Sequence, residues 1–227
     1  MSNKDITLKD YTVGEERFNW ITHLSGFLLA VAATVLIILR AARGGGAFGI
    51  ASAAVYGASM MILYAGSTIY HALPRGGAKK RARVIDHCSI FILIAGTYTP
   101  YALITLREAL PWLGWTVFGI VWGGGLLGII LNLIDLKRFS KLSMACYITF
   151  GWCGVASGYW LFTNLEIWGI VLLLAGGVFY TVGAVFYAMG KKRKYIHSVW
   201  HLFVLAGTVA QFFGIYFYVF IYFYFLA

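Results

Sequence analysis

The sequence predicts an all-α membrane protein built as a bundle of seven transmembrane helices. Composition is the first observation behind this prediction: the 227 residues are 61% hydrophobic and only 11% charged, whereas soluble domains are about half apolar and a quarter charged. Hydropathy is the second, because seven stretches have the roughly 20 mostly apolar residues that cross a bilayer as a helix. The third is charge, because Lys and Arg fall in short clusters between these stretches.

The seven stretches follow one another with short connectors and leave no segment for a soluble domain. They cover residues 18–39, 47–73, 84–106, 110–134, 142–162, 167–189 and 195–227. We therefore expect residues 1–17 to form a short cytoplasmic N-terminal segment and residues 18–227 to form a single transmembrane domain. The start of the chain is polar and mixed in charge, which argues against a cleavable signal peptide, so the first apolar stretch should remain as a membrane anchor.

The positive charges predict the orientation of the bundle. Of the 18 Lys and Arg residues, 15 lie in the N-terminal segment or in the loops after the second, fourth and sixth stretches. The other side has only Arg40, Arg43 and Arg107. Since Lys and Arg collect on the cytoplasmic side of membrane proteins, this places the N-terminus in the cytoplasm and, after seven crossings, the C-terminus outside.

Several other classes of function find no support in the sequence. The net charge of +10 is divided among the short clusters, so it forms no basic surface for nucleic acid. Three cysteines, Cys88, Cys146 and Cys153, fall inside apolar stretches, which argues for free thiols and against a secreted disulfide framework. The glycines within the stretches suit close helix packing, and no phosphate-binding fingerprint of the P-loop type is present.

Ionisable side chains inside a membrane span are costly and mark functional sites by default. The candidates here are His23, His71, Asp86, His87, His197 and His201. In the predicted orientation His71 lies in the last turn of the second stretch, Asp86 in the first turn of the third, and His197 in the first turn of the seventh. At 1.5 Å per residue, three helices therefore deliver these side chains to one level just below the cytoplasmic surface.

The spacing within this set predicts a metal site. His197 and His201 are four residues apart and share one helix face, and His71 supplies a third imidazole. Imidazole suits zinc among several divalent metals, and three protein ligands with an open fourth position are the catalytic arrangement, in which a bound water ionises near neutral pH. Asp86 is either a fourth ligand or the general base for that water. Ser67, one turn before His71, shares its face and is placed to bind the water or a substrate carbonyl.

Two further histidines have weaker claims on the metal. His87 lies about 100° around the helix from Asp86, so it either supports the site from outside or faces the lipid interface. His23 has the right depth, but for this residue we favour a structural hydrogen bond to a neighbouring helix.

These motifs, in this order, resemble the signature of the progestin and adipoQ receptor family. The residues that carry the resemblance are Ser67-x-x-x-His71, Asp86 in Ile85-Asp86-His87-Cys88-Ser89-Ile90-Phe91, and His197-x-x-x-His201. Its bacterial branch, called hemolysin III or TrhA, is a membrane homeostasis group, and it is also matched by Glu16-x-x-Asn19-x-x-Thr22-His23, by residues 95–100 and by residues 176–183. The similarity covers nearly the whole chain from about Glu15.

The resemblance implies a seven-helix protein of the bacterial cytoplasmic (inner) membrane with zinc on His71, His197 and His201. It also implies that Asp86 is associated with the zinc-bound water and that Ser67 lies beside it. Ceramidase-like relatives make a zinc-dependent hydrolase of lipid amides or esters the leading hypothesis, with membrane lipids as partners and a lipid-like substrate or ligand. The alternatives are a non-enzymatic sensor or regulator with structural zinc and a pore-forming hemolysin. A pore needs polar stripes through the full depth of the membrane, whereas the outer halves of these stretches are almost wholly apolar.

Overall fold

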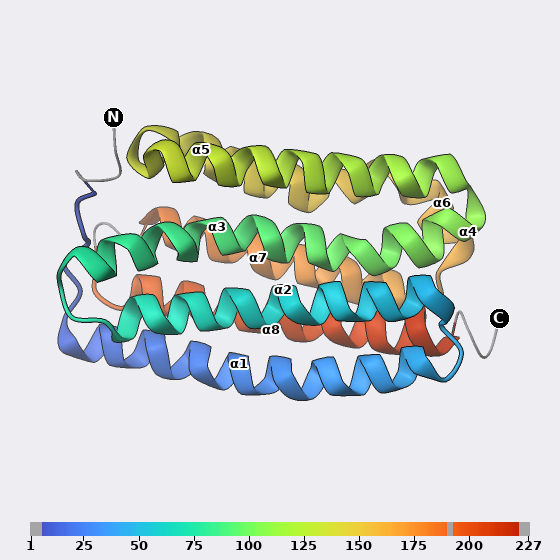
Figure 1. Cartoon of the computed structure of the whole chain (residues 1–227), viewed down its shortest axis with the longest axis horizontal. Coiled ribbons are helices and arrows are strands. Elements are labelled where there is room, and N and C mark those ends of the chain that lie inside the picture. Colours follow the sequence, from blue (N-terminus) through green and yellow to red (C-terminus); the bar gives the residue numbers. More distant parts are fainter. Residues whose placement is uncertain (1–5, 190–192, 223–227) are drawn as a thin grey trace.

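Every regular element in the part of the chain that the structure describes, residues 6–189 and 193–222, is helical. This computed structural model therefore confirms the all-α prediction, and the long helices lie side by side along one axis (Figure 1). The elements are α1 (Val13–Ala42), α2 (Gly46–Ala72), α3 (Gly77–Pro100), the π-helical segment η2 (Tyr101–Leu106), α4 (Arg107–Ala109), α5 (Pro111–Trp152), the 3-10 segment η3 (Cys153–Ser157), α6 (Gly158–Asn164), α7 (Ile167–Met189), α8 (Ile196–Phe213) and the π-helical segment η4 (Gly214–Tyr222).

Six helical stretches among the described residues are long and apolar enough to cross a membrane, so the chain is a multi-pass membrane protein. Large apolar side chains cover the outside of the bundle, as a lipid environment allows; they include Leu28, Leu29, Leu126, Leu127 and Val185. Aliphatic, aromatic and polar side chains fill the inside, where Tyr56, Tyr64 and Tyr101 are almost fully buried.

The fourth of these stretches, Pro111–Asn164, contains 54 residues and covers both the fourth and the fifth predicted helices. It is interrupted at Asp135, whose backbone (φ −158°, ψ 91°) lies outside the helical region. The Asp135 carboxylate accepts a hydrogen bond of 3.0 Å from the backbone N–H of Arg138, which is the N-cap arrangement that starts a new helix. Figure 1 shows the chain turning back at this end of α5.

The observed boundaries correct the predicted ones at several points. The first helix begins at Val13 and not at residue 18, and helix resumes directly after Asp135 and not at residue 142. The sixth predicted stretch, 167–189, matches α7 (Ile167–Met189). The last stretch reaches residue 227, but residues 223–227 lie outside the described part. Seven crossings, and the side of the membrane on which each end lies, stay predictions.

Small residues let neighbouring helices approach closely, as the sequence suggested. α1 packs on α2, α2 on α3, α3 on α5, and α7 on α8. A Cβ atom built on Gly96 would lie 2.1 Å from Oγ of Ser59, and one built on Gly57 would lie 2.4 Å from the side chain of Thr34. These contacts hold the helices in the register that sets the depth of the polar side chains.

That register brings the predicted site residues to one end of the bundle. The end of α2 with His71, the first half of α3 with Asp86 and the start of α8 with His197 lie at the same end, opposite α4 (Figure 1). Because α3 begins at Gly77 and not at residue 84, Asp86 lies in its third turn and not in its first. The prediction of a common level is therefore confirmed for the second, third and last helices.

Candidate metal centre

The start of α8, which carries two of the three histidines, is fixed by a glutamate from α1. Thr12 and Glu15 form a capping box, in which the Thr12 hydroxyl accepts from the Glu15 N–H and the Glu15 carboxylate accepts from the Thr12 N–H. The other oxygen of Glu15 accepts a 2.8 Å hydrogen bond from the N–H of Tyr195. Tyr195 precedes α8 in the left-handed conformation (φ 61°), which is unfavourable for a side chain of this kind, and the bond to Glu15 helps to hold it there.

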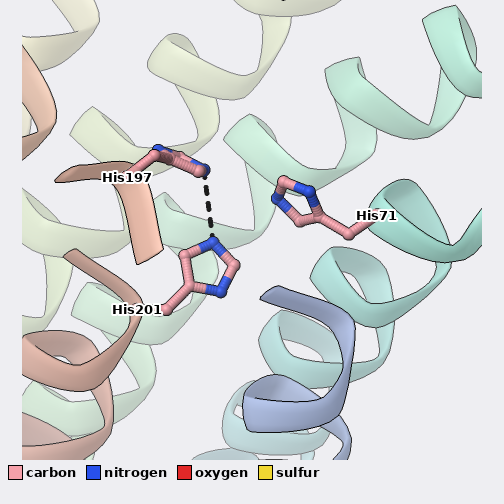
Figure 2. A group of neighbouring side chains, drawn as sticks. All are labelled: His71, His197 and His201. Carbon is pink, nitrogen blue, oxygen red and sulfur yellow. Dashed lines mark hydrogen bonds between the residues drawn. The ribbon is translucent and has the colours of Figure 1, made fainter. Parts of the chain in front are cut away.

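His71, His197 and His201 converge in the interior of the bundle (Figure 2). Each offers one ring nitrogen, and these three atoms all lie within 4.8 Å of one another. The Nε2 atoms of His197 and His201 are 3.2 Å apart. All three residues are buried, with His71 and His201 only 2% and 1% exposed. The structure thus brings together the complete ligand set that the sequence predicted.

His71 is held by α1 as well as by its own helix. Its Nδ1 atom lies 2.6 Å from Oε2 of Glu16 and 3.4 Å from the amide nitrogen of Asn19. The other carboxylate oxygen of Glu16 lies 2.9 Å from the ammonium group of Lys79, a side chain that is itself buried. Asn19 also accepts a 2.7 Å hydrogen bond from the hydroxyl of Ser198 on α8. One face of α1 therefore joins the ends of α2 and α8.

Aromatic stacking holds the other two ligands. The ring of His23 stacks on His201 with centroids 3.7 Å apart and meets Tyr64 edge to face at 5.2 Å. No hydrogen bond is found for either nitrogen of His23 among the described residues, so the expected structural hydrogen bond is wrong and ring packing takes its place. Tyr11 stacks on His197 with centroids 5.0 Å apart.

Tyr11 belongs to a short segment before α1, residues 6–12, that packs against the histidines through the Tyr11 ring. Ile6 is buried against Val84 and Cys88, and the backbone carbonyl of Thr7 accepts a hydrogen bond from Arg83. Burial raises the pKa of the Tyr11 phenol above its ordinary value, so the ring that covers His197 is uncharged. The N-terminal segment therefore packs onto the site.

Ser67 and Asp86 lie in the wall of a small cavity of about 30 Å³, together with His197, His201 and His87. This volume is about that of one water molecule. Asp86 is 3.4 Å from Nδ1 of His87, and the Nε2 atom of His87 lies 3.1 Å from the hydroxyl of Tyr187. His87 therefore faces the inside of the bundle, which favours the expectation that it supports the site over the expectation that it faces lipid.

The donor atoms fit a divalent metal ion. Buried nitrogens with no hydrogen-bond partner among the described residues include Nε2 of His71, and this nitrogen faces the other two imidazoles in Figure 2. A buried polar atom without a partner is destabilising, and an ion among the three rings would satisfy it. Three imidazoles with a carboxylate and a hydroxyl in the adjacent cavity are a set that can bind a metal and activate water.

Comparison with known proteins shows the family of the chain. The model of the family described as haemolysin-III related matches residues 11–212. The chain belongs to this haemolysin-III family. Its relatives include "Hemolysin-3" of Bacillus cereus, 42% identical over 91% of this chain and 93% of the relative, and the "Hemolysin-3 homolog" of Bacillus subtilis (strain 168), 41% identical over 92% and 96%. The resemblance to the hemolysin III branch is thereby confirmed.

A more distant relative extends the haemolysin-III similarity to animals. The "Monocyte to macrophage differentiation factor" of Homo sapiens is 25% identical over 73% of this chain and 69% of its own length. No solved structure gives a significant match.

The supporting roles of the residues around the histidines were not predicted from the sequence. Glu16 and Asn19 entered only as part of a motif that carries the family resemblance, although they are three residues apart on one face at the start of an apolar helix. Lys79 was counted with the positive charges of its loop, although its side chain is buried. Tyr11 precedes the helix and carries no pattern, so only the folded chain reveals its contact with His197.

Proposed function

We propose that this protein binds zinc through His71, His197 and His201 and uses it to hydrolyse an amide or ester bond of a membrane lipid. The observation that carries the proposal is that two members of the three-imidazole cluster, His197 and His201, line a small cavity together with Ser67 and Asp86. Imidazole nitrogen is a common zinc ligand, and three protein ligands leave one position open. The positive loops support a location of this site beneath the cytoplasmic face of a bacterial inner membrane.

The roles of the side chains follow from their chemistry. Zinc held by three imidazoles supplies a Lewis acid that activates water and polarises a carbonyl oxygen. Asp86 is the only carboxylate found in the wall of the small cavity, and it takes the proton from the attacking water as general base. Ser67, also in this wall, donates a hydrogen bond to the oxyanion that develops on the substrate carbonyl.

A larger apolar cavity supports the choice of a lipid substrate. It has a volume of about 280 Å³ and is lined by residues such as Ile94, Tyr98, Leu173 and Tyr180. The hydroxyl of Tyr180 bonds to that of Thr208 at 2.9 Å, and Thr208 accepts a 2.8 Å hydrogen bond from Tyr64, whose ring contacts His23. These packed side chains lie between the large cavity and the histidines, so an acyl chain in the large cavity would bring its carbonyl to the metal site only if they move.

The test is fatty-acid release from a panel of ester- and amide-linked lipids by the purified protein in lipid nanodiscs. We expect release by the wild type and its loss in Asp86→Asn, while one zinc ion per chain remains bound. Asp135→Asn is the matched control, because Asn caps a helix as well as Asp does and Asp135 lies outside the cavity. A zinc-loaded wild type that releases nothing from any lipid would overturn the hydrolase proposal.

The size of the small cavity favours a second candidate, a membrane regulator in which zinc only joins α2 to α8. A space of about 30 Å³ admits a water molecule but no substrate, and Tyr11 stacks on His197 in its wall. In this case Asp86→Asn leaves the cellular phenotype intact, while His197→Ala removes it. The third hypothesis, a pore, receives no such support, because bulky side chains such as Tyr56 and Phe91 fill the interior.

A further inference from the structure

We infer that Glu16 is a positioning residue for the metal site: its carboxylate accepts the Nδ1 proton of His71 and so directs the Nε2 lone pair towards the ion. This inference rests on the proposed metal site but not on the proposed hydrolysis. The contact between Oε2 of Glu16 and Nδ1 of His71 is 2.6 Å, a length typical of a charge-assisted hydrogen bond. Because a carboxylate only accepts, the proton belongs to His71.

The proton position determines which nitrogen can bind a metal. A neutral imidazole with its proton on Nδ1 has its lone pair on Nε2. In His71, Nε2 is buried and has no hydrogen-bond partner among the described residues. Histidine ligands of metals commonly donate their second N–H to a carboxylate, which fixes the tautomer and the ring orientation and raises the basicity of the ligand.

Lys79 binds the second oxygen of the Glu16 carboxylate. Its ammonium group lies 2.9 Å from Oε1 of Glu16, so the two carboxylate oxygens have separate partners. The same group donates to the backbone carbonyls of His71, at 3.3 Å, and Leu73, at 2.9 Å. These two carbonyls belong to the end of α2, so Lys79 is anchored there independently of Glu16. The alternative is that Glu16 serves only as the ion-pair partner of Lys79. In that case the contact between Oε2 of Glu16 and His71 has no role in metal binding.

The support given to the three ligands is asymmetric. Within residues 6–189 and 193–222, the Nδ1 atoms of His197 and His201 have no hydrogen-bond partner, and Tyr11 and His23 stack on their rings. Of the three histidines, His71 alone has a carboxylate oxygen of the described residues within hydrogen-bonding distance of its ring. α1 supplies no ligand of its own, yet through Glu16 it determines how the ligand from α2 is presented to the pair on α8.

The experiment measures zinc affinity by competition with a coloured chelator in the purified, full-length protein. Replacing Glu16 alone would leave Lys79 buried without its carboxylate partner, so the main variant is the double change Glu16→Met with Lys79→Met, which removes both charges. We expect it to lower zinc affinity about 10- to 100-fold. Lys79→Met alone, which retains the carboxylate, should change affinity less than about threefold. Glu16→Gln with Lys79→Met should recover part of the loss, because an amide oxygen still accepts the His71 proton.

Glu108→Gln is the matched control, since Glu108 pairs with Arg107 in α4 at the opposite end of the bundle (Figure 1). It should bind zinc as the wild type does. As a second readout, Co²⁺ in place of zinc should show visible bands that shift when Glu16 is replaced but not when Glu108 is. This spectrum reports ligand geometry and would not respond to a purely structural ion pair.

The outcomes separate this inference from the proposed function. Equal zinc affinity in the wild type and in both Glu16 double variants would overturn the role of Glu16 and leave the metal site standing. A wild type that binds no zinc would overturn both. Failure to hydrolyse lipids, with the affinity ranking as expected, would overturn the hydrolase proposal alone.

Discussion

The Nε2 atoms of His197 and His201 lie 3.2 Å apart in the interior of the bundle. Two nitrogens bound to one tetrahedral zinc ion at about 2.0–2.1 Å are expected to be about 3.3 Å apart. The spacing of four residues along α8 has therefore already produced the separation of a ligand pair. The third nitrogen of the set, from His71, lies within 4.8 Å of the others, so a small movement of its ring would complete the site.

The first prediction concerns the ligands themselves. Replacing His201 by Ala removes one of three nitrogens, so we expect metal content to fall from about one ion per chain to less than about one tenth, because affinity depends on the complete ligand set. The measurement is elemental analysis of protein purified in detergent. His87→Ala is the control, because His87 lines the same cavity but is outside the ligand set. Equal metal loss in both variants would contradict the assignment.

The second prediction concerns stability. If three histidines of α2 and α8 hold one ion, removing it loosens the contact between these helices. An ion present at about 1,000 times its dissociation constant stabilises the folded state by about 4 kcal/mol, which corresponds to a rise in melting temperature of about 10 °C for a chain of this size. We expect a strong chelator to lower the melting temperature of the wild type by that amount and to leave the His201→Ala variant unchanged. An equal effect on both proteins would show that the chelator acts elsewhere.

The histidine cluster could be predicted from sequence because helical periodicity and topology determine it. His197 and His201 share a face by helical spacing alone, and the basic loops place them at the same level as His71. The support around them could not be predicted in this way. The bond from Glu16 to His71 joins residues 55 positions apart and depends on the crossing of α1 over α2, about which neither segment carries a local signal.

The fold shows the same division. Hydropathy located the long helices, but it placed the start of the fifth at residue 142. The polar run around Asp135 looked like a loop, whereas its carboxylate caps the next helix directly, and Ser143 bonds back to Asn132 at 2.6 Å. Capping by a single side chain is a short-range effect, and hydropathy averaged over a window of residues does not detect it.

The third prediction tests the packing of α3 on α5. A Cβ atom on Gly128 would lie 2.2 Å from the ring of Phe91, which is buried. We expect Gly128→Leu to destabilise the fold by about 1–3 kcal/mol through overpacking, measured as a lower melting temperature. Gly119→Leu is the control on the same helix, because nothing lies within 4 Å of a Cβ built there. A Gly128→Leu protein as stable as this control would contradict the packing described for α3 and α5.

The fourth prediction tests the orientation of the bundle. By the positive-inside rule, Arg193 faces the cytoplasm and Glu108 faces the outside, and both are exposed. In intact cells we expect a membrane-impermeant maleimide to label Glu108→Cys but not Arg193→Cys, and to label both once the membrane is opened. The three native cysteines are free, so the unmodified chain is the necessary background control. Labelling of Arg193→Cys but not of Glu108→Cys in intact cells would show that the bundle has the opposite orientation.

The fifth prediction concerns the cover that residues 6–12 place over the site. Tyr11 stacks on His197, and its ring centroid also lies 5.7 Å from that of His71. Removing the Tyr11 ring should therefore open a path from water to these two histidines. We expect Tyr11→Ala to raise the rate at which a water-soluble chelator extracts the metal about tenfold or more, because local opening of the cover then no longer limits access.

Tyr11→Phe is its matched control. It keeps the ring and loses only the hydroxyl, so extraction should stay near the wild-type rate. The equilibrium affinity for zinc should change less than the rate in Tyr11→Ala, because Tyr11 is outside the ligand set. Equal extraction rates in the wild type, Tyr11→Ala and Tyr11→Phe would show that metal leaves by another route, such as the cavity lined by Ser67 and Asp86. The segment before α1 would then pack against the site without controlling access to it.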